Sequence, residues 1–260
     1  MRNLPNSILI TGASSGIGQS LAIFYAQPGK ILFLWGRSEQ KLQQTAQACK
    51  DKGATVYTYP IDLTNPMAAT TLLNEILNEH RIDMTILAAG SGDIKAEHDL
   101  LESQDTLYNL AQLNYVTPSL MANLIARQMI EKHIQGKIIL ISSVAGFHSL
   151  PFATAYSSSK AGLTRFSDSL RLAVKKWKIQ VTLIIPGFID TPMSQRLECD
   201  KPFLIPINKA TTQITNAIAE GKRELILPRI FNLLKWVDLI APNCIRDLIL
   251  SRIKVKQDTK

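Results

Sequence analysis

The chain has 260 residues, of which 46% are hydrophobic and 19% charged, with 29 Lys plus Arg against 21 Asp plus Glu and a formal net charge of +8. The apolar content excludes a disordered chain, and the length allows one large α/β domain or two small ones. Three widely spaced cysteines (Cys49, Cys199 and Cys244) exclude a disulfide scaffold and fit a reducing cytoplasm, and with only four His they leave little for a metal site.

Short apolar blocks alternate with helical patterns along the chain. The first apolar run covers only residues 8–10, too short for a signal peptide, so we expect no leader and a cytoplasmic location. The blocks predict strands at 7–11, 30–35, 54–59, 83–89, 137–143, 180–186 and 224–227, and the patterns between them predict helices at about 16–27, 38–52, 66–80, 104–132, 155–177 and 206–220. Continuous apolar blocks are typical of buried parallel strands. The alternation therefore predicts a doubly wound, Rossmann-like α/β fold, with about seven parallel strands and helices on both faces.

A glycine-rich loop joins the first predicted strand to the first predicted helix. It reads Thr11-Gly12-Ala13-Ser14-Ser15-Gly16-Ile17-Gly18. Glycines let the backbone approach a phosphate, and the N–H groups and dipole at a helix N-terminus attract a pyrophosphate. We therefore predict that a dinucleotide binds at Gly12, Ser14, Ser15, Gly16, Ile17 and Gly18, with a tight structural turn as the alternative.

Two charged residues follow the next strands. Arg37 comes directly after the second strand, where an NAD-binding site would carry an acidic residue. An arginine there can pair with the 2′-phosphate of NADP, so we expect NADP(H) rather than NAD, although Arg37 could also be a solvated residue at a helix start. Asp62 follows the third strand and could either accept a hydrogen bond from the adenine amino group or cap the next turn; both interpretations stay open.

A serine, a tyrosine and a lysine form the strongest chemical pattern. Tyr156 and Lys160 lie four residues apart at a helix start, so they share one face of the helix. A nearby ammonium favours the phenolate, so we expect Lys160 to lower the pKa of Tyr156 from about 10. Ser143 ends the fifth strand, at the sheet edge where doubly wound folds bind ligands. This combination predicts proton transfer by a tyrosine near neutral pH.

Taken together, these motifs resemble the short-chain dehydrogenase/reductase family. TGASSGIG, Asp62, Asn114 in LNYVTP, ISS ending at Ser143, YSSSK and PGFIDTPM occur in the family's order over residues 5–195. The resemblance implies a catalytic tetrad of Asn114, Ser143, Tyr156 and Lys160. It also implies further cofactor contacts at Leu63, Ala89, Gly90, Pro186, Gly187, Ile189 and Thr191. One departure is Ala88-Ala89-Gly90, where the family usually has Asn-Ala-Gly, which puts local rigidity in question.

The resemblance implies an oxidoreductase that moves a hydride between nicotinamide and a carbonyl or secondary alcohol. Apolar residues between 186 and 221, such as Phe188, Met193 and Leu204, favour an apolar, lipid- or steroid-like substrate. The family resemblance also implies a homodimer or homotetramer. Two other classes are a catalytically silent cofactor sensor or scaffold and, given the basic excess, a nucleic-acid binder. Silent proteins usually lose the Tyr or the Lys, and no nucleic-acid motif is present, so we expect neither.

We expect residues 1–228 to form one dinucleotide-binding and catalytic domain and residues 229–260 a helical extension. Residues 221–260 hold nine basic and four acidic residues, so much of the positive charge lies at this end. Apolar residues at helical spacing predict either a helical pair packed on the core, a second subunit or the substrate pocket, or an interfacial anchor on an anionic membrane. The second interpretation would place the protein on the inner membrane surface. Nothing in this part is long enough to span a bilayer.

Overall fold

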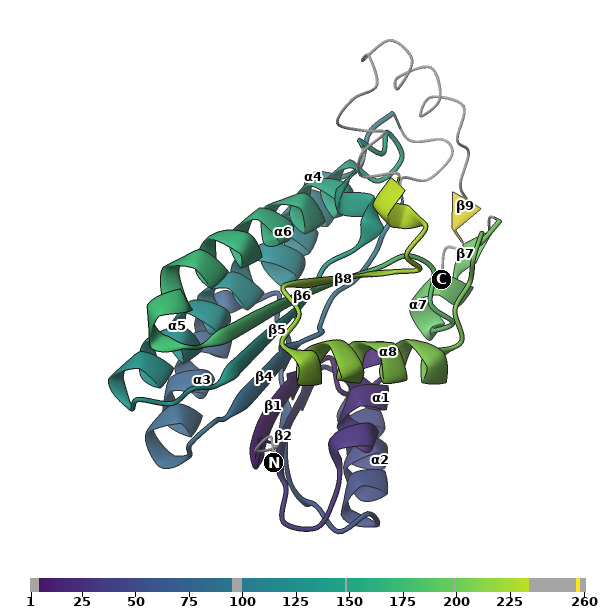
Figure 1. Cartoon of the computed structure of the whole chain (residues 1–260). Helices are drawn as coiled ribbons and strands as arrows, with labels where there is room; N and C mark the ends of the chain where they lie inside the picture. The colour runs from purple at the N-terminus through teal and green to yellow at the C-terminus, as the bar shows by residue number, and fades with distance from the viewer. Residues whose placement is uncertain (1–4, 95–99, 148, 199, 234–255, 258–260) are drawn as a thin grey trace.

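A computed structural model describes residues 5–94, 100–147, 149–198, 200–233 and 256–257. Its centre is a parallel sheet of seven strands in the order β3-β2-β1-β4-β5-β6-β8 (Figure 1). The strands are β1 (Ser7–Thr11), β2 (Ile31–Gly36), β3 (Thr55–Pro60), β4 (Met84–Leu87), β5 (Lys137–Ile141), β6 (Gln180–Pro186) and β8 (Glu224–Leu227). This confirms the predicted doubly wound parallel sheet. β4 and β5 end before the predicted 89 and 143, because the chain leaves the sheet there to form loops.

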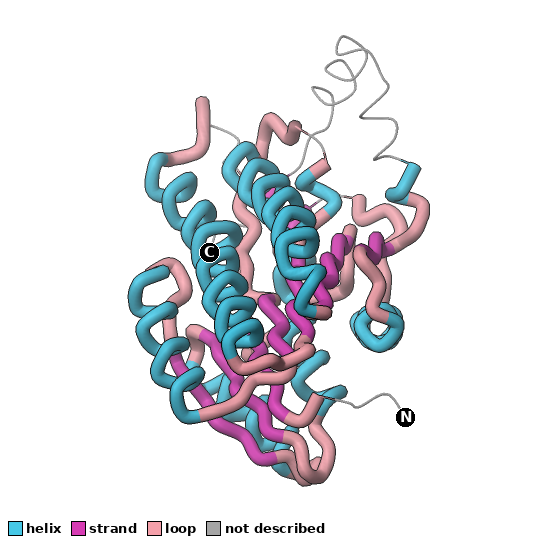
Figure 2. Tube along the Cα trace, turned by 60° about the vertical axis from the view of Figure 1, so that its left-hand side comes forward, coloured by secondary structure: helices cyan, strands magenta, loops and turns pink. Residues whose placement is uncertain are grey.

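Helices cover both faces of the sheet, as Figures 1 and 2 show. They are α1 (Gly16–Tyr25), α2 (Glu39–Lys50), α3 (Pro66–Glu79), α4 (Gln104–Ala111), α5 (Thr117–Glu131), α6 (Thr154–Val174) and α8 (Ile207–Glu220). Successive strand side chains point to opposite faces. Leu9 therefore packs into the core under α3, α5 and α6, whereas Ile8 and Ile10 pack into the core under α1, α2 and α8. Both faces of β1 are buried, which explains its uninterrupted apolar sequence.

The helix predicted over 104–132 is interrupted. Between α4 and α5 the chain forms one π-helical turn, Gln112–Val116, in which the N–H of Thr117 bonds to the carbonyl of Gln112. Pro118 has no N–H, so it cannot serve the carbonyl of Asn114 four residues earlier as an α-helix would. Such π turns are frequent at functional sites, and here the turn carries Asn114.

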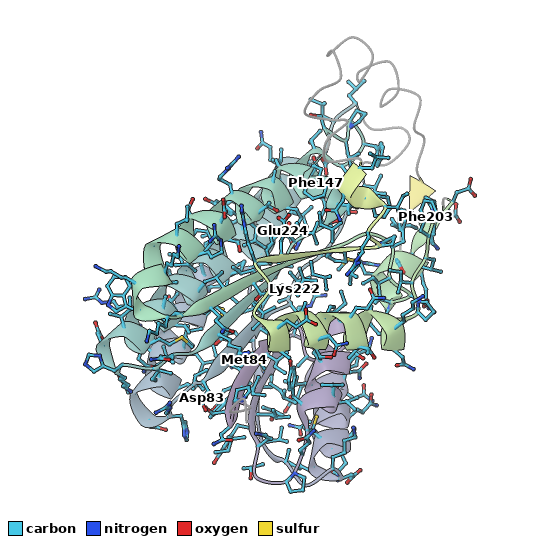
Figure 3. All side chains as sticks on the ribbon, in the orientation of Figure 1. Asp83, Met84, Phe147, Phe203, Lys222 and Glu224 are labelled. Atoms are coloured by element: carbon cyan, nitrogen blue, oxygen red, sulfur yellow. The ribbon has the colours of Figure 1, made fainter. Side chains whose placement is uncertain are left out.

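Short elements lie beyond the carboxyl ends of the strands. They are α7 (Pro192–Gln195) and an antiparallel pair of β7 (Leu197–Glu198) with β9 (Lys256–Gln257). In Figure 3, Phe203 labels the side of the sheet where the strands end, and Asp83 labels the opposite side, where β4 begins. The predicted helical extension falls mostly on residues 234–255, outside the described residues, whereas residues 256–257 form a strand. Within the described part of the chain, no helix is long and apolar enough to cross a membrane.

Candidate active site

The glycine loop between β1 and α1 has no room for a side chain at Gly12 or Gly18. Gly12 and Gly16 have left-handed backbones, with φ of +67° and +55°. A Cβ on Gly12 would lie 2.9 Å from the Cα of Ala89, and one on Gly18 would lie 2.4 Å from the carbonyl oxygen of Gly12. Ser15 precedes the helix but its side chain does not cap it. The first N–H groups of α1 are thus not taken by this side chain, which suits a phosphate cradle.

Arg37 and Asp62, the two charged residues predicted to contact the cofactor, both lie on the surface. Arg37 is exposed directly after β2, where a Cβ on Gly36 would lie 3.0 Å from the Oγ of Ser14. Asp62 is also exposed, and its Oδ1 accepts hydrogen bonds from the N–H and the hydroxyl of Thr64, both at 2.9 Å. Asp62 therefore does cap the turn after β3. A role in binding adenine stays a prediction.

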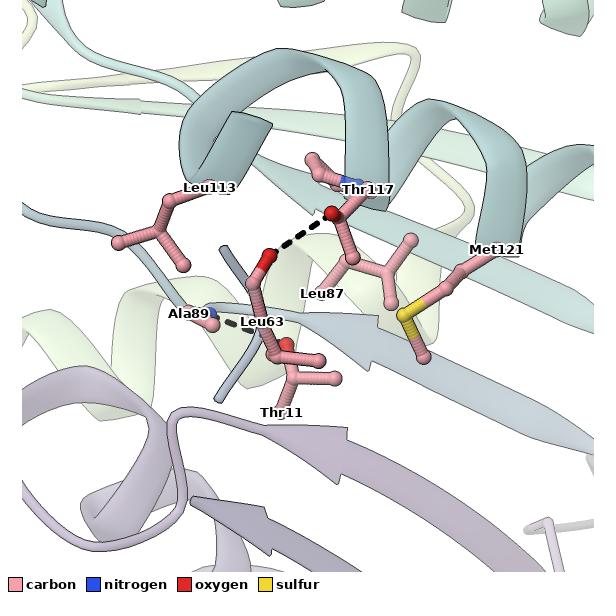
Figure 4. A pocket seen from close by; sticks show the side chains of 8 residues that line it. Thr11, Leu63, Leu87, Ala89, Leu113, Thr117 and Met121 are labelled. Carbon is pink, nitrogen blue, oxygen red and sulfur yellow. Dashed lines mark hydrogen bonds between the residues drawn. The ribbon is translucent and has the colours of Figure 1, made fainter. Parts of the chain in front are cut away.

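A narrow recess, too tight to admit a water molecule, lies beside the glycine loop (Figure 4). Its lining residues come from β1, the loop after β3, β4 and the loop after it, the π turn and α5: Thr11, Leu63, Leu87, Ala89, Leu113, Thr117, Pro118 and Met121. Two hydrogen bonds brace it: the Thr117 hydroxyl donates to the Leu63 carbonyl at 2.8 Å, and the Ala89 N–H donates to the Thr11 hydroxyl at 3.0 Å. The Thr11 bond holds this loop although Ala88 replaces the usual asparagine.

Asn114 is fully buried and its side-chain amide is used for structure. Its Oδ1 accepts from the N–H of Ser91 at 3.1 Å, while its Nδ2 donates to the Ser91 carbonyl at 2.9 Å and to the Ser159 hydroxyl at 3.2 Å. The π turn, the loop after β4 and α6 are thereby joined. A Cβ on Gly90 would lie 3.0 Å from the Oδ1 of Asn114 and 3.2 Å from the Nζ of Lys160, so these groups converge.

Lys160 and Tyr156 meet at the N-terminal end of α6. Lys160 is 4% exposed, and its Nζ donates to the Ile141 carbonyl at 3.1 Å and lies 5.9 Å from the centre of the Tyr156 ring. Burial lowers the pKa of Lys160 to about 8. Burial also raises the pKa of Tyr156 above its usual value of 10, and a hydrogen bond to Ser143 offsets only part of that rise. The expected lowering of the tyrosine pKa is therefore wrong for this state, because desolvation outweighs the neighbouring charge.

The third member of the pattern, Ser143, lies two residues after the end of β5 and is 8% exposed. Its hydroxyl oxygen accepts from the N–H of Ala145 at 3.1 Å. The preceding Ser142 donates to the Lys160 carbonyl at 2.9 Å, which ties this loop to α6. Ser143, Tyr156 and Lys160 thus form one cluster at the carboxyl edge of the sheet, as their sequence positions predict.

The loop after β6 lies beside the glycine loop. A Cβ on Gly16 would lie 3.4 Å from the Cγ2 of Thr191, which caps α7. The N–H of Gly187 donates to the Leu227 carbonyl at 2.7 Å, and Phe231 packs so closely that a Cβ on Gly187 would lie 2.4 Å from its ring. Pro186, at the end of β6, and the buried Ile189 thereby lie in a loop held from two sides.

Sequence reasoning missed several residues around the cluster. A Cβ on Gly92 would lie 3.7 Å from the Tyr156 ring and 3.8 Å from the sulfur of Met193, so Gly92 marks the wall in front of the tyrosine. Ser91 and Ser159 hold Asn114 in place. Phe231, assigned to the extension, is 7% exposed and belongs to the core. Of these residues, only Ser91 and Gly92 could have been found from the sequence, because they directly follow the predicted cofactor contact Gly90. Among the described residues, no three metal-ligating side chains come together.

Comparison with known proteins gives consistent matches. The family model of the short chain dehydrogenase matches residues 6–202. An oxidoreductase of Myxococcus xanthus is 28% identical over 95% of this chain and 96% of its own, and the 11-beta-hydroxysteroid dehydrogenase-like 2 protein of Arabidopsis thaliana is 29% identical over 95% and 81%. A short-chain dehydrogenase from Sphingobium yanoikuyae in complex with NADPH is similar with a TM-score of 0.79, 25% identity and coverage of 96% and 97%. 4-Hydroxyisoleucine dehydrogenase complexed with NADH has the same fold, with a TM-score of 0.73, 24% identity and coverage of 85% and 96%.

Proposed function

Because the chain belongs to the short-chain dehydrogenase family and is an oxidoreductase, we propose that it interconverts a carbonyl and a secondary alcohol of an apolar substrate with NADP(H). The observation that carries this proposal is the cluster of Ser143, Tyr156 and Lys160 at the carboxyl ends of the strands, on the same side of the sheet as a loop that requires glycine at positions 12 and 18. A bound nicotinamide would supply or accept the hydride; the protein binds, orients and moves the proton.

Each residue of the cluster has a role that its surroundings support. Tyr156 is the proton donor to the carbonyl oxygen, and its raised pKa keeps it protonated until it reacts. Ser143 lies close enough to the tyrosine to lower its pKa in part, and it is placed to hold the same substrate oxygen. The ammonium of Lys160, buried near the ring, stabilises the phenolate that remains after proton transfer. Pro118 leaves the Asn114 carbonyl without its helical donor, so that oxygen can hold a water that returns the proton.

The loops after β1, β3, β4 and β6 together support binding of a dinucleotide along its whole length. Gly12, Gly16 and Gly18 leave backbone N–H groups open to a pyrophosphate. Asp62 and Leu63 lie on the adenine side, next to the recess of Figure 4. Ala89 and Gly90 line the middle, and Pro186, Gly187, Ile189 and Thr191 border the nicotinamide. At Gly12, Gly18 and Gly187 a Cβ would clash with neighbouring protein atoms, so these loops need glycine to keep the close packing that sets the shape of the site.

We expect Arg37→Ala to weaken NADPH binding by about 10- to 100-fold and to leave NADH binding within about threefold. A charge-assisted contact to the 2′-phosphate is worth roughly 1.5–3 kcal/mol, and NADH has no such phosphate. Isothermal titration of both cofactors measures the difference. Arg127→Ala is the matched control, because Arg127 is an exposed arginine paired with Glu131 on α5. Equal losses for NADPH and NADH would show that Arg37 does not select the cofactor.

An apolar substrate is supported by the side chains near the tyrosine. Gly92 lies between its ring and the sulfur of Met193, and Met193, Phe203 and Leu204 are 37%, 61% and 43% exposed. A panel of carbonyl compounds, from short polar ketones to cyclic and steroid ketones and long-chain aldehydes, tests this by NADPH oxidation. We expect kcat/KM to rise with apolar size. Turnover of none of them would contradict the proposed reaction, and a preference for short polar ketones would contradict the substrate class.

Three expectations about assembly and place belong to this proposal. Exposed apolar side chains on α4, the π turn and α5 (Leu107, Tyr108, Tyr115 and Leu120) support a homodimer or homotetramer through these helices. Sedimentation of the purified protein measures this oligomeric state.

Contact of residues 229–260 with an anionic membrane is tested by co-sedimentation with anionic vesicles. If the protein does not bind these vesicles at low salt, the membrane anchor is excluded. The buried Phe231 supports packing on the core for the start of this segment. A cytoplasmic location completes the proposal.

A further inference from the structure

The helix that carries Tyr156 and Lys160 does not cap its own N-terminus. The residue before α6 is Ala153, whose methyl group cannot accept a hydrogen bond. The first N–H groups of a helix have no partner within the helix and need one from elsewhere. By contrast, α2, α3 and α4 each begin after a Ser or Asn whose side chain accepts from the first turn. The first turn of α6 includes Tyr156, so its order matters for the reaction.

Glu102 supplies the missing cap from a distant part of the chain. Its Oε2 accepts from the N–H of Ala155 at 2.9 Å and from the hydroxyl of Thr154. The negative charge also suits the positive end of the helix dipole. Glu102 lies in the segment between β4 and α4, more than fifty residues before the helix that it caps.

Two residues at the beginning of this segment, Ser91 and Gly92, lie beside the site. At its beginning, Ser91 is fixed by both polar atoms of the Asn114 side chain, and Gly92 lies against the Tyr156 ring. At its end, Glu102 is bonded to the turn that carries Tyr156. Ser91 is therefore tied to the π turn and Glu102 to α6, and the ring of Tyr156 lies against Gly92.

We propose that Glu102 is a positioning residue that fixes Tyr156 relative to the loop after β4. The proposal rests on the proposed function, since it assigns Glu102 to the same proton-transfer step. Within the described part of the chain, the hydrogen bonds of Glu102 go to Thr154 and Ala155 in the first turn of α6, so its effect is expected in kcat rather than in cofactor binding. Misplacement of a reacting group by about 1 Å can cost about 10²-fold in rate.

Steady-state kinetics of two variants test the role. We expect Glu102→Ala to lower kcat by about 10- to 100-fold with the KM for NADPH within about twofold of wild type. Glu102→Gln keeps a carbonyl oxygen at the same place, so it is expected to retain kcat within about threefold. In a Tyr156→Phe background, Glu102→Ala is expected to add little, because a positioning residue acts through the group that it places.

Asn65→Ala is the matched control. Asn65 caps α3 by accepting from the N–H of Ala68 at 3.1 Å, and α3 carries no residue of the site. We expect this variant to lose about as much thermal stability as Glu102→Ala but to keep kcat. If Asn65→Ala and Glu102→Ala lower kcat equally, or if Glu102→Gln is as slow as Glu102→Ala, the positioning role is refuted.

Amide hydrogen exchange gives a readout that needs no turnover. We expect the amides of Ala155 and its neighbours in the first turn of α6 to exchange about tenfold faster in Glu102→Ala, and at wild-type rates in Asn65→Ala. Unchanged exchange in Glu102→Ala overturns the cap itself. A wild-type protein that turns over no carbonyl compound, but loses this protection in Glu102→Ala, refutes the proposed function and leaves the cap standing.

Discussion

Tyr156→Phe is expected to lower kcat by about 10²–10⁴-fold while leaving the fold and NADPH binding nearly intact. The change removes one hydroxyl and keeps the ring that packs against Gly92. Ser143 keeps its bond from the Ala145 N–H, so no buried hydroxyl loses all its partners. The proton for the substrate oxygen then has no donor at the right place, which is why the loss falls on the chemical step.

Single-turnover kinetics, NADPH binding by fluorescence and thermal unfolding together measure this outcome. Tyr57→Phe is the control, because Tyr57 is 41% exposed on β3, the edge strand away from the cluster. It is expected to keep full activity. If Tyr156→Phe retains more than about a tenth of wild-type kcat, another group donates the proton.

The sheet could be predicted from the sequence, because its strands are buried on both faces. The apolar run of residues 8–10 in β1 is typical of a strand buried on both faces in a chain of alternating strands and helices. The break near Asn114 was missed, because the hydrophobic pattern continues through it. Its local sign was Pro118, which removes a backbone donor without changing the periodicity.

The central cluster could also be predicted, because its residues follow strand ends that share one edge of the sheet. The residues that hold this cluster in place could not be predicted. Ser91 matters only because Asn114 reaches it, and Glu102 only because the chain brings it to Ala155. Phe231 lies in the segment read as a separate extension, yet it packs against Gly187. Contacts of this kind depend on the tertiary arrangement and leave no periodic pattern.

The pKa of Tyr156 was predicted in the wrong direction for an instructive reason. The spacing of Tyr156 and Lys160 indicates proximity of a charge, which favours the phenolate. Burial of both groups is not visible in the spacing, and it favours the neutral form of each. The site therefore holds a tyrosine that keeps its proton and a lysine whose buried charge destabilises the fold.

This destabilisation by the buried ammonium leads to a prediction for a variant that removes it. Lys160→Met is expected to lower kcat by about 10²-fold or more, yet to increase the free energy of unfolding near neutral pH by about 1–2 kcal/mol. The ammonium near the reacting phenol is lost, and with it the charge that stabilises the phenolate. Burial holds the pKa of Lys160 at about 8 against 10.5 for an ordinary lysine, which corresponds to roughly 3 kcal/mol of destabilisation. The lost bond to the Ile141 carbonyl offsets about 1 kcal/mol of the gain.

The pH dependence of this difference identifies its source. Between about pH 8 and 10.5 the unfolded chain binds the lysine proton more tightly than the folded one, so the stability of the wild type rises with pH in this window. Below it the lysine is charged in both states and the penalty is complete. The advantage of Lys160→Met is therefore largest below pH 8 and fades as the pH rises through the window. Urea unfolding at several pH values measures it, with Lys41→Met as control, because Lys41 is exposed on α2. A variant less stable than the wild type near neutral pH would show that the buried ammonium stabilises the fold, and that catalysis and stability are not opposed at this residue.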